Sequence, residues 1–315
     1  MEKIKKQEWN YHPNIPIENN PLFAFPLRLK KIIKWYIDMW APFSETAFCL
    51  IVAMVYLFLL PPIVLFKNFN FNSILTIYLF NITIMLIVAG GLHLFFYTLK
   101  KQDDKLKYDL RSFSNNKKFT FNKQVLDNIF WSLVSGVTIW TFYQILLLWS
   151  YSNGFISKIS LSANPFLFFF LFFVVIFFES IHFYFVHRLL HFKFFYKLFH
   201  HIHHRNINPG PWSGISMHPF EHLFYFSTVL IHFIIPSHPI HILFHFMIVT
   251  IGAVVGHCGF DGFLINKKNK IALGHFHHQL HHRYFECNYG TIETPIDVLF
   301  KSFYDGTSDT NKKFK

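Results

Sequence analysis

Three clusters of histidine residues stand out in this chain of 315 residues. They are His187 with His191, His200 with His203 and His204, and His278 with His281 and His282. The spacing within each cluster is i, i+4 or i, i+3, i+4, which places the side chains on one face of a helix. Imidazole is the commonest protein ligand for transition metals, and these eight exceed what one zinc ion needs. The spacing therefore predicts a dinuclear, non-haem metal centre.

Neighbouring histidines in a cluster cannot serve the same ion equally well. Adjacent residues such as His203 and His204 diverge by about 100° around a helix axis. One of them can therefore bind one ion while the other binds the second. We expect three short helical elements to converge and to surround two ions.

The sequence also indicates which metal chemistry to expect. It has no H-E-x-x-H motif, so a zincin-type peptidase would lack its general base. Soluble di-iron bundles use glutamates with E-x-x-H motifs, whereas the ligands here are almost all imidazole. Neutral ligands at a centre that faces lipid suggest oxygen activation at iron. A zinc-dependent membrane hydrolase remains an alternative, since zinc has no redox chemistry. A non-catalytic metal-binding or transport protein is a weaker one.

The elements that must position these clusters are long apolar segments. The chain is 52% hydrophobic and contains 44 Phe. Four runs reach the ~18 residues of a bilayer span, at about 43–66, 73–97, 130–151 and 164–186. Two shorter runs, 223–236 and 240–256, are predicted to form an apolar hairpin. The predicted fold is thus all-α, a polytopic membrane helix bundle of about four full spans plus a short hairpin, with a helical cap that carries the histidine-rich di-metal site.

Loop charges predict the orientation of this bundle. Residues 1–42 carry seven Lys or Arg and residues 98–129 carry eight, whereas 67–72 and 152–163 carry one each. Cytoplasmic loops retain Lys and Arg, so the first two segments and the histidine clusters are predicted to face the cytoplasm. This predicts a multi-pass protein of the cell membrane in a bacterium, or of the endoplasmic reticulum in a eukaryote.

The net charge of +12 has the same explanation. A basic chain can bind nucleic acid, but no Gly-rich phosphate loop or basic-aromatic motif supports that function here. We therefore expect a membrane and no nucleic acid among the partners. The three cysteines form no C-x-x-C pair, and their odd number argues against a disulfide framework and fits a reducing compartment.

Residues 164–307 resemble the fatty acid hydroxylase/sterol desaturase superfamily of integral membrane, non-haem di-iron oxygenases. The resemblance rests on the three clusters and on these flanking motifs: Tyr196-Lys197, His218-Pro219-x-Glu221, His257-x-Gly259, Asn288-Tyr289-Gly290 and Asp297. It implies that the eight clustered histidines bind two iron ions. It also implies that O₂ and two electrons drive hydroxylation or desaturation of a C–H bond in a fatty acyl, alkyl or sterol-like lipid.

The resemblance implies further ligands between the second and third clusters. His257 is the best candidate and His218 is next. Side chains that hydrogen-bond metal-bound imidazoles also tune such centres, and Glu221, Asp261 and Asn288 are the candidates for this role.

The expected organisation has four parts. Residues 1–42 form a cytoplasmic N-terminal segment, 43–163 are membrane-anchor helices with the basic loop 98–129, 164–307 are the catalytic domain and 308–315 are a polar tail. Neither end is long enough for a haem-binding electron-transfer module, so we expect a separate electron-donor protein.

Overall fold

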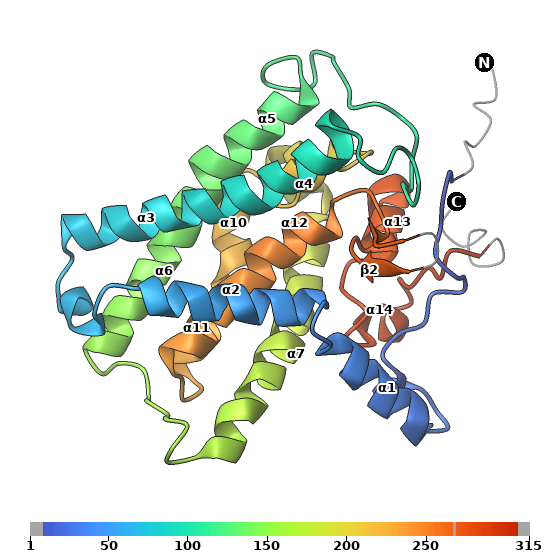
Figure 1. Ribbon diagram of the computed structural model, residues 1–315. Helices are drawn as coiled ribbons and strands as arrows, with labels where there is room; N and C mark the ends of the chain where they lie inside the picture. The colour runs from blue at the N-terminus through green and yellow to red at the C-terminus, as the bar shows by residue number, and fades with distance from the viewer. Residues whose placement is uncertain (1–8, 267–268, 308–315) are drawn as a thin grey trace.

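The computed structural model describes residues 9–266 and 269–307. Long helices lie side by side and form most of the molecule, and a smaller region of short helices and two strands lies at one end of them (Figure 1). The predicted polar tail 308–315 lies outside the described residues.

The α-helices differ widely in length, and several continue through π-helical turns. The α-helices are α1 Leu29–Met39, α2 Glu45–Leu59, α3 Phe71–Met85, α4 Gly91–His93, α5 Gln124–Phe130, α6 Val137–Ser152, α7 Pro165–Leu190, α8 Lys193–Phe195, α9 His201–His204, α10 Pro219–Phe226, α11 Pro239–Met247, α12 Ala253–Gly256, α13 Phe276–Tyr284 and α14 Ile296–Leu299. The π-helical turns are η3 Leu86–Gly90, η4 Leu94–Thr98, η5 Trp131–Gly136, η6 Tyr196–His200 and η9 Ile248–Gly252.

Shorter elements connect these helices. The 3₁₀ helices are η1 Pro21–Phe23, η2 Ile63–Lys67, η7 Pro211–Ser213 and η8 Ser227–Phe233. The strands β1 Gly262–Leu264 and β2 Lys270–Ala272 pair antiparallel.

Among the described residues, four helices are long and apolar enough to cross a membrane. They are Phe71–Thr98, Gln124–Ser152, Pro165–Leu190 and Pro239–Gly256. The first, second and fourth run through π-helical turns without a break. The predicted all-α membrane bundle with four spans is therefore confirmed.

These four helices are not the four that the sequence predicted. The predicted run 43–66 is divided at Pro61-Pro62 into the 15-residue helix α2 and the short 3₁₀ helix η2. Proline has no N–H to continue a helix, and 15 residues rise about 22 Å, less than a bilayer core of about 30 Å. By contrast, the second arm of the predicted hairpin, 240–256, lies in a helix of 18 residues. This helix packs mainly against α2.

A polar contact inside the bundle links three helices. The Asn81 side chain of α3 donates hydrogen bonds to Thr141 Oγ1 at 3.0 Å and Gln144 Oε1 at 3.1 Å, both on α6. Its Oδ1 accepts one from the Tyr56 hydroxyl of α2 at 2.8 Å. Polar side chains between apolar helices form hydrogen bonds with one another because no water is present there to take the place of their partners. The contact fixes how α2, α3 and α6 are aligned.

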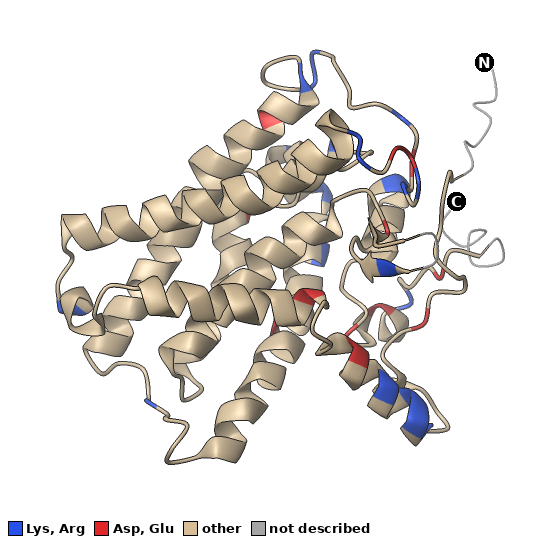
Figure 2. Cartoon of the chain, viewed as in Figure 1, with Lys and Arg blue, Asp and Glu red and all other residues tan. Residues whose placement is uncertain are grey.

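Charged residues avoid the sides of the bundle and gather at one end. Figure 2 shows the long helices almost free of Lys, Arg, Asp and Glu along their length, whereas charges surround α1, α13 and β2. The outer face of α7 is rich in phenylalanine, and Phe166, Phe169 and Phe170 are exposed there. Such exposed apolar surface is what lipid contact requires.

Candidate metal centre

The histidine clusters lie where helices end or begin. His187 is in the last turn of α7, and His191 directly follows that helix as its C-terminal cap. The second cluster lies on η6 and α9, and the third lies on α13. His257 follows α12 as its C-terminal cap. Segments up to 95 residues apart in the chain thus bring imidazoles to one place (His187 and His282).

The structure sorts nine imidazoles into two groups. Group 1 consists of His187, His191, His200, His204 and His281, and group 2 of His203, His257, His278 and His282. Within each group the candidate ligand atoms all lie within 4.8 Å of one another. The neighbours His203 and His204 fall into different groups, as the helical repeat predicts.

The ring nitrogens of group 1 approach one another closely. His191 Nε2 lies 3.0 Å from His204 Nε2 and 3.2 Å from the Nε2 atoms of His200 and His281. The Nε2 atoms of His204 and His281 are 3.0 Å apart.

Group 2 has the same geometry around His257. Its Nε2 lies 3.0 Å from His282 Nε2, 3.1 Å from His278 Nε2 and 3.4 Å from His203 Nε2. The Nε2 atoms of His278 and His282 are 3.1 Å apart.

Acceptors at the outer edge of both groups fix which nitrogen carries the proton. His200 Nδ1 lies 2.6 Å from Glu221 Oε1. The Nδ1 atoms of three other rings each lie 2.6 or 2.7 Å from a backbone carbonyl oxygen, which only accepts: His187 from Tyr289 O, His257 from Ala253 O and His281 from Cys287 O. Nδ1 must therefore donate, which leaves a lone pair on Nε2. Second hydrogen bonds of this kind are typical of metal-bound histidines.

The Nε2 atoms consequently face one another as acceptors and cannot all be satisfied by hydrogen bonds between themselves. A cation between them would receive their lone pairs. With metal–nitrogen bonds of about 2.0–2.1 Å, neighbouring ligands around one ion lie about 3.0–3.4 Å apart. The observed separations of 3.0 to 3.4 Å have this spacing. The residues thus fit two metal ions.

Burial also keeps these imidazoles in the form that binds metal. Burial lowers the pKa of His200, His204 and His281 well below 6.5, and neighbouring imidazoles lower it further. Burial lowers the pKa of His257 to about 4. Neutral imidazoles at neutral pH have the free lone pair that coordination needs.

Of the remaining candidates, Glu221 lies next to a clustered histidine. It comes from α10, is 1% exposed, and accepts the hydrogen bond from His200 Nδ1 at 2.6 Å. Its second oxygen, Oε2, is buried without a hydrogen-bond partner among the residues described. The other candidate ligand, His218, lies outside both groups and caps α10 through a bond from Phe220 N.

Asp261 and Asn288 have other partners. The Asp261 carboxylate accepts hydrogen bonds from the hydroxyls of Tyr11 and Tyr108, each at 3.1 Å, and pairs with Lys270. Asn288 binds the backbone through His277 O at 3.1 Å and Tyr304 O at 3.0 Å. Both therefore hold chain segments around α13, and no hydrogen bond of theirs reaches a ring of either group among the described residues.

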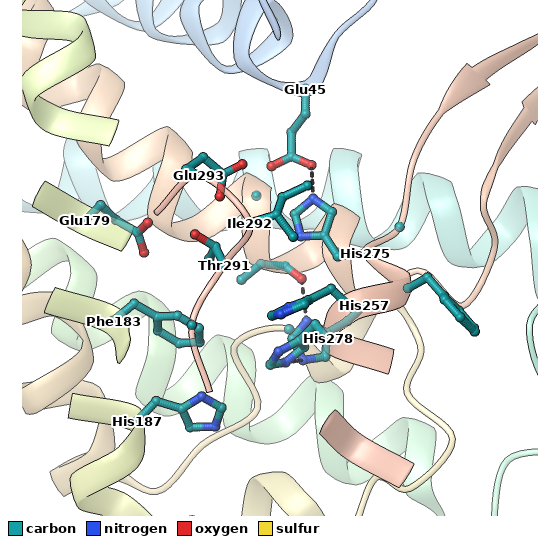
Figure 3. Close-up of a pocket in the computed structure, with 18 of the residues that line it drawn as sticks. Glu45, Glu179, Phe183, His187, His257, His275, His278, Thr291, Ile292 and Glu293 are labelled. Atoms are coloured by element: carbon teal, nitrogen blue, oxygen red, sulfur yellow. Dashed lines mark hydrogen bonds and ion pairs between the residues drawn. The ribbon is translucent and has the colours of Figure 1, made fainter. Parts of the chain in front are cut away.

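A cavity of about 590 Å³ extends from the two groups. His187, His200, His203, His257 and His278 line one end of it. The opposite end is lined by Glu45, Glu179, Glu293 and His275 (Figure 3). Glu45 and Glu293 are isolated glutamates in distant segments, so no spacing pattern in the sequence marks them.

Comparison with known proteins identifies the region that carries this site. The family model described as fatty acid hydroxylase matches residues 172–302. The Delta(7)-sterol 5(6)-desaturase ERG3B of Gibberella zeae is 34% identical over 130 residues, which is 40% of this chain and 39% of that protein. The lathosterol oxidase of Homo sapiens is 30% identical over 138 residues, 44% of this chain and 46% of that protein.

The similarity is thus regional. The matches span less than half the length of these curated relatives. No solved structure matches the chain. The matched residues 172–302 nevertheless contain all nine histidines of the two groups. Residues 172–302 thus match the fatty acid hydroxylase family, and this region is similar to sterol desaturases.

Proposed function

We propose that this protein is an O₂-dependent membrane oxidoreductase that hydroxylates or desaturates a C–H bond of a sterol-like lipid at two iron ions. The observation that carries the proposal is the pair of imidazole groups at one end of the cavity. The similarity to sterol desaturases supports a lipid as the substrate and oxidation as the reaction.

The protein's own residues prepare the site. Bound iron would supply the activation of O₂ that oxidation of an unactivated C–H bond needs, since no side chain can supply it. Tyr289 O, Glu221 and Cys287 O hold the Nδ1 protons, so the rings keep one orientation. Rings held in this way need little reorganisation when a metal binds.

The walls of the cavity suit an apolar molecule. Phe183 stacks on His187 with ring centroids 4.9 Å apart, and its edge meets Tyr225 at 6.1 Å. Ile176 and Met217 also line the cavity. These side chains would hold a hydrocarbon skeleton against the histidines and exclude water from it.

The oxidation also needs electrons from outside the site. We propose that a separate donor protein delivers two electrons for each reaction. The charged end of the molecule, around α13, offers basic residues for its docking (Figure 2). We further propose that this end faces the cytoplasm, as the loop charges predict.

The test combines metal analysis with lipid analysis. The purified protein should contain about two iron ions per chain. Cells that express it should accumulate a sterol-like lipid that has gained one oxygen or lost two hydrogens, and only when O₂ is present. His281→Ala should abolish both the product and at least one metal ion. His201→Ala, which changes an exposed neighbour of the second cluster, should preserve both.

One combination of metal content and activity would contradict the proposal. Two zinc ions without iron, together with a hydrolytic activity that does not require oxygen, would contradict the proposal. That result would instead identify a zinc-dependent membrane hydrolase.

A further inference from the structure

Helix α1 exposes an apolar stripe at the charged end of the molecule. The helix lies beside α2 and projects outward from the bundle (Figure 1). None of its eleven residues is buried. Leu29, Ile33 and Ile37 are 71%, 58% and 63% exposed, and their spacing of four residues puts them on one face. Contact between three aliphatic side chains and water is unfavourable, so this stripe indicates an apolar partner.

A second side of α1 packs against the protein. The centroid of the Tyr36 ring lies 6.0 Å from that of Phe173 in α7, and the Tyr36 hydroxyl accepts a hydrogen bond from Asn20 Nδ2 at 3.1 Å. Trp35 and Met39 line the cavity that extends from the histidine groups. At about 100° per residue, this side is turned by about 110° from the exposed stripe. The stripe is therefore not the face that the protein covers.

A third side of α1 is basic. Residues 28–39 contain four Lys or Arg and one Asp. The helical repeat places the three lysines of the helix about 110° from the stripe, on the side away from the cavity. They are Lys30, Lys31 and Lys34. Lys31 pairs with Glu18 at 3.0 Å and Lys34 with Asp38 at 2.7 Å, but both pairs are exposed and contribute little. Positive charge thus remains available beside the apolar stripe (Figure 2).

The apolar surface of α1 continues into the lipid-facing surface of the bundle. The segment before α1 exposes Phe23, Phe25 and Leu27. The Phe23 ring meets the ring of Phe177 edge-on, with centroids 6.2 Å apart, and Phe177 belongs to the membrane-spanning helix α7. The stripe therefore lies where a spanning helix approaches the charged end of the molecule. In a bilayer this is the level of the lipid headgroups.

We propose that α1 lies in the membrane surface at the charged end of the molecule and binds the headgroups of anionic phospholipids. The stripe of Leu29, Ile33 and Ile37 would enter the acyl-chain boundary, and the lysines would contact lipid phosphates. A helix with one apolar and one basic side binds an anionic membrane surface in this way. The long lysine side chains can reach the headgroups while their stems cover apolar surface.

Two other occupants fit the stripe less well. A second copy of this chain, docked through the same face, would bring the lysines of both copies close together, because a two-fold contact pairs a surface with itself. A water-soluble partner would have to cover an apolar surface that is continuous with the lipid-facing side of α7. A bilayer meets both the apolar and the basic side at once.

This contact would also hold one wall of the cavity. Trp35 and Met39 line the cavity from the same helix that carries the stripe. A helix that rests on lipid headgroups has less freedom to move away from α7. The proposal concerns the seating of the protein in its bilayer and does not rest on the oxidation proposed above.

A fluorescent probe on the stripe tests its location. The full-length protein is placed in lipid nanodiscs, one chain per disc, with a polarity-sensitive fluorophore on Ile33→Cys. The background is low because the three native cysteines are buried. Ile87→Cys, exposed on a spanning helix, is the control within the bilayer, and Lys117→Cys in the basic loop is the control in water.

Lipids that carry a nitroxide on the acyl chain quench probes that they touch. We expect the Ile33 probe to be quenched about fivefold more than the Lys117 probe, and more by a nitroxide near the headgroup than by one near the chain end. The Ile87 probe should show the reverse depth preference. Replacing part of the phosphatidylcholine by phosphatidylglycerol should increase the quenching of the Ile33 probe about twofold.

Charge reversal tests the lysines. Lys30→Glu combined with Lys34→Glu should abolish the increase with phosphatidylglycerol. Lys117→Glu combined with Lys118→Glu makes the same change of charge in the exposed basic loop and should preserve it. A loss confined to the first pair is not an effect of the total charge of the protein. Both pairs are exposed, so the Ile87 probe should respond alike in the two variants and report an intact bundle.

Three results would overturn the proposal. Quenching of the Ile33 probe as weak as that of the Lys117 probe would place α1 in water. Equal quenching with and without phosphatidylglycerol in the parent would exclude the anionic headgroups. Protection of the Ile33 probe only when two chains share a disc would identify a second copy as the occupant. None of these measurements uses metal, O₂ or turnover, so failure of the proposed oxidation would leave them unchanged.

Discussion

Group 2 depends on His257 more than on any other residue. Its Nε2 is the atom that approaches all three other Nε2 atoms of the group, at 3.0, 3.1 and 3.4 Å. Its Nδ1 donates to Ala253 O at 2.7 Å, so the ring is held from behind. The position of His257 is thus set by the end of α12 and not by any histidine cluster.

Removing this ring should therefore empty one ion position. We expect His257→Ala to bind about one metal ion per chain where the parent binds about two, because three imidazoles on short elements hold an ion less tightly than four. His218→Ala is the matched control, since His218 lies outside both groups and caps α10. Elemental analysis measures the number of metal ions per chain in each variant. Equal metal loss in both variants would contradict the assignment of His257 to group 2.

Glu221 should act through His200. Its Oε1 accepts the Nδ1 proton of that ring at 2.6 Å in a fully buried environment. Glu221→Leu removes the acceptor and should weaken metal affinity by about 10–100-fold. Glu221→Gln keeps an amide oxygen in its place and should retain most of the affinity. Competition with a metal chelator measures both variants, and similar losses would show that charge, and not the hydrogen bond, is what matters.

The sequence predicts which imidazoles gather better than it predicts the groups that hydrogen-bond to them. Eight histidines follow from helical spacing alone, and all eight fall into the two groups. His257 and His218 are isolated histidines in sequence, and only the fold separates them. Three of the Nδ1 acceptors are the carbonyls of Tyr289, Ala253 and Cys287. Every residue has a carbonyl, so no residue type marks these positions.

Among the elements, α12 is placed by contact with a glycine. A Cβ on Gly214 would lie 2.6 Å from the carbonyl C and O of Ala253 and 2.7 Å from Val254 N. These are backbone atoms at the start of α12, so they cannot move aside as a side chain can. Any residue larger than glycine must push α12 away, and His257 with it.

We accordingly expect Gly214→Ala to destabilise the protein by about 1–3 kcal/mol, the usual effect of overpacking. It should also lower the metal content, because His257 moves. Gly91→Ala is the control, since a Cβ there meets nothing within 4 Å. That variant should unfold at the same or a slightly higher temperature. Thermal unfolding in detergent tests both, and a silent Gly214→Ala would show that the two elements separate freely.

The Glu45–His275 pair joins α2 to the segment before α13 and should make stability depend on pH. Burial alone would lower the pKa of His275, but Glu45 and the nearby glutamates outweigh it and raise the pKa to about 9. A raised pKa means that the pair stabilises the fold fully below pH 6.5 and that this contribution is lost as the pH rises through 9.

The matching measurement compares the unfolding temperature of the parent and of Glu45→Gln at several pH values. The parent should be more stable below pH 6.5, and the difference should shrink as the pH rises through about 9. A difference that is constant over this range would show that the pair contributes no charge interaction.

Some apolar runs in the sequence predict the long helices correctly, and others do not. Runs 73–97, 130–151 and 164–186 each lie within a long helix, since nothing interrupts them. In 43–66 the effect of Pro61-Pro62 outweighed the length of the run, and α2 ends at Leu59. In 240–256 the π-helical turn η9 lets one helix continue to Gly256. Packing against other helices determines whether a helix continues, and hydropathy averaged along the sequence carries no information on packing.

In the whole molecule, the distribution of charge and the position of the cavity are related. The long helices are almost uncharged along their length, and the charges lie beside the region that carries α13 (Figure 2). The cavity lies at this boundary, and α7 runs from the exposed Phe166 to His187 of group 1. An apolar molecule could therefore reach the histidines from the apolar side of the bundle.

This arrangement predicts which loops each side of the membrane can reach. If the positive-inside rule holds, the basic loop 98–129 and the histidine groups face the cytoplasm, and the loop 152–163 faces the opposite side. Lys117→Cys and Ser162→Cys place single exposed thiols in these two loops. The background is low because Cys49, Cys258 and Cys287 are all buried.

In intact cells a membrane-impermeant maleimide should label Ser162→Cys directly. It should label Lys117→Cys only after permeabilisation. The reverse pattern would place the metal centre on the outer side, where no cytoplasmic donor could supply electrons. The proposed electron route, and not the histidine geometry, would then have to be abandoned, because the two groups are defined by contacts within the chain that do not depend on which side they face.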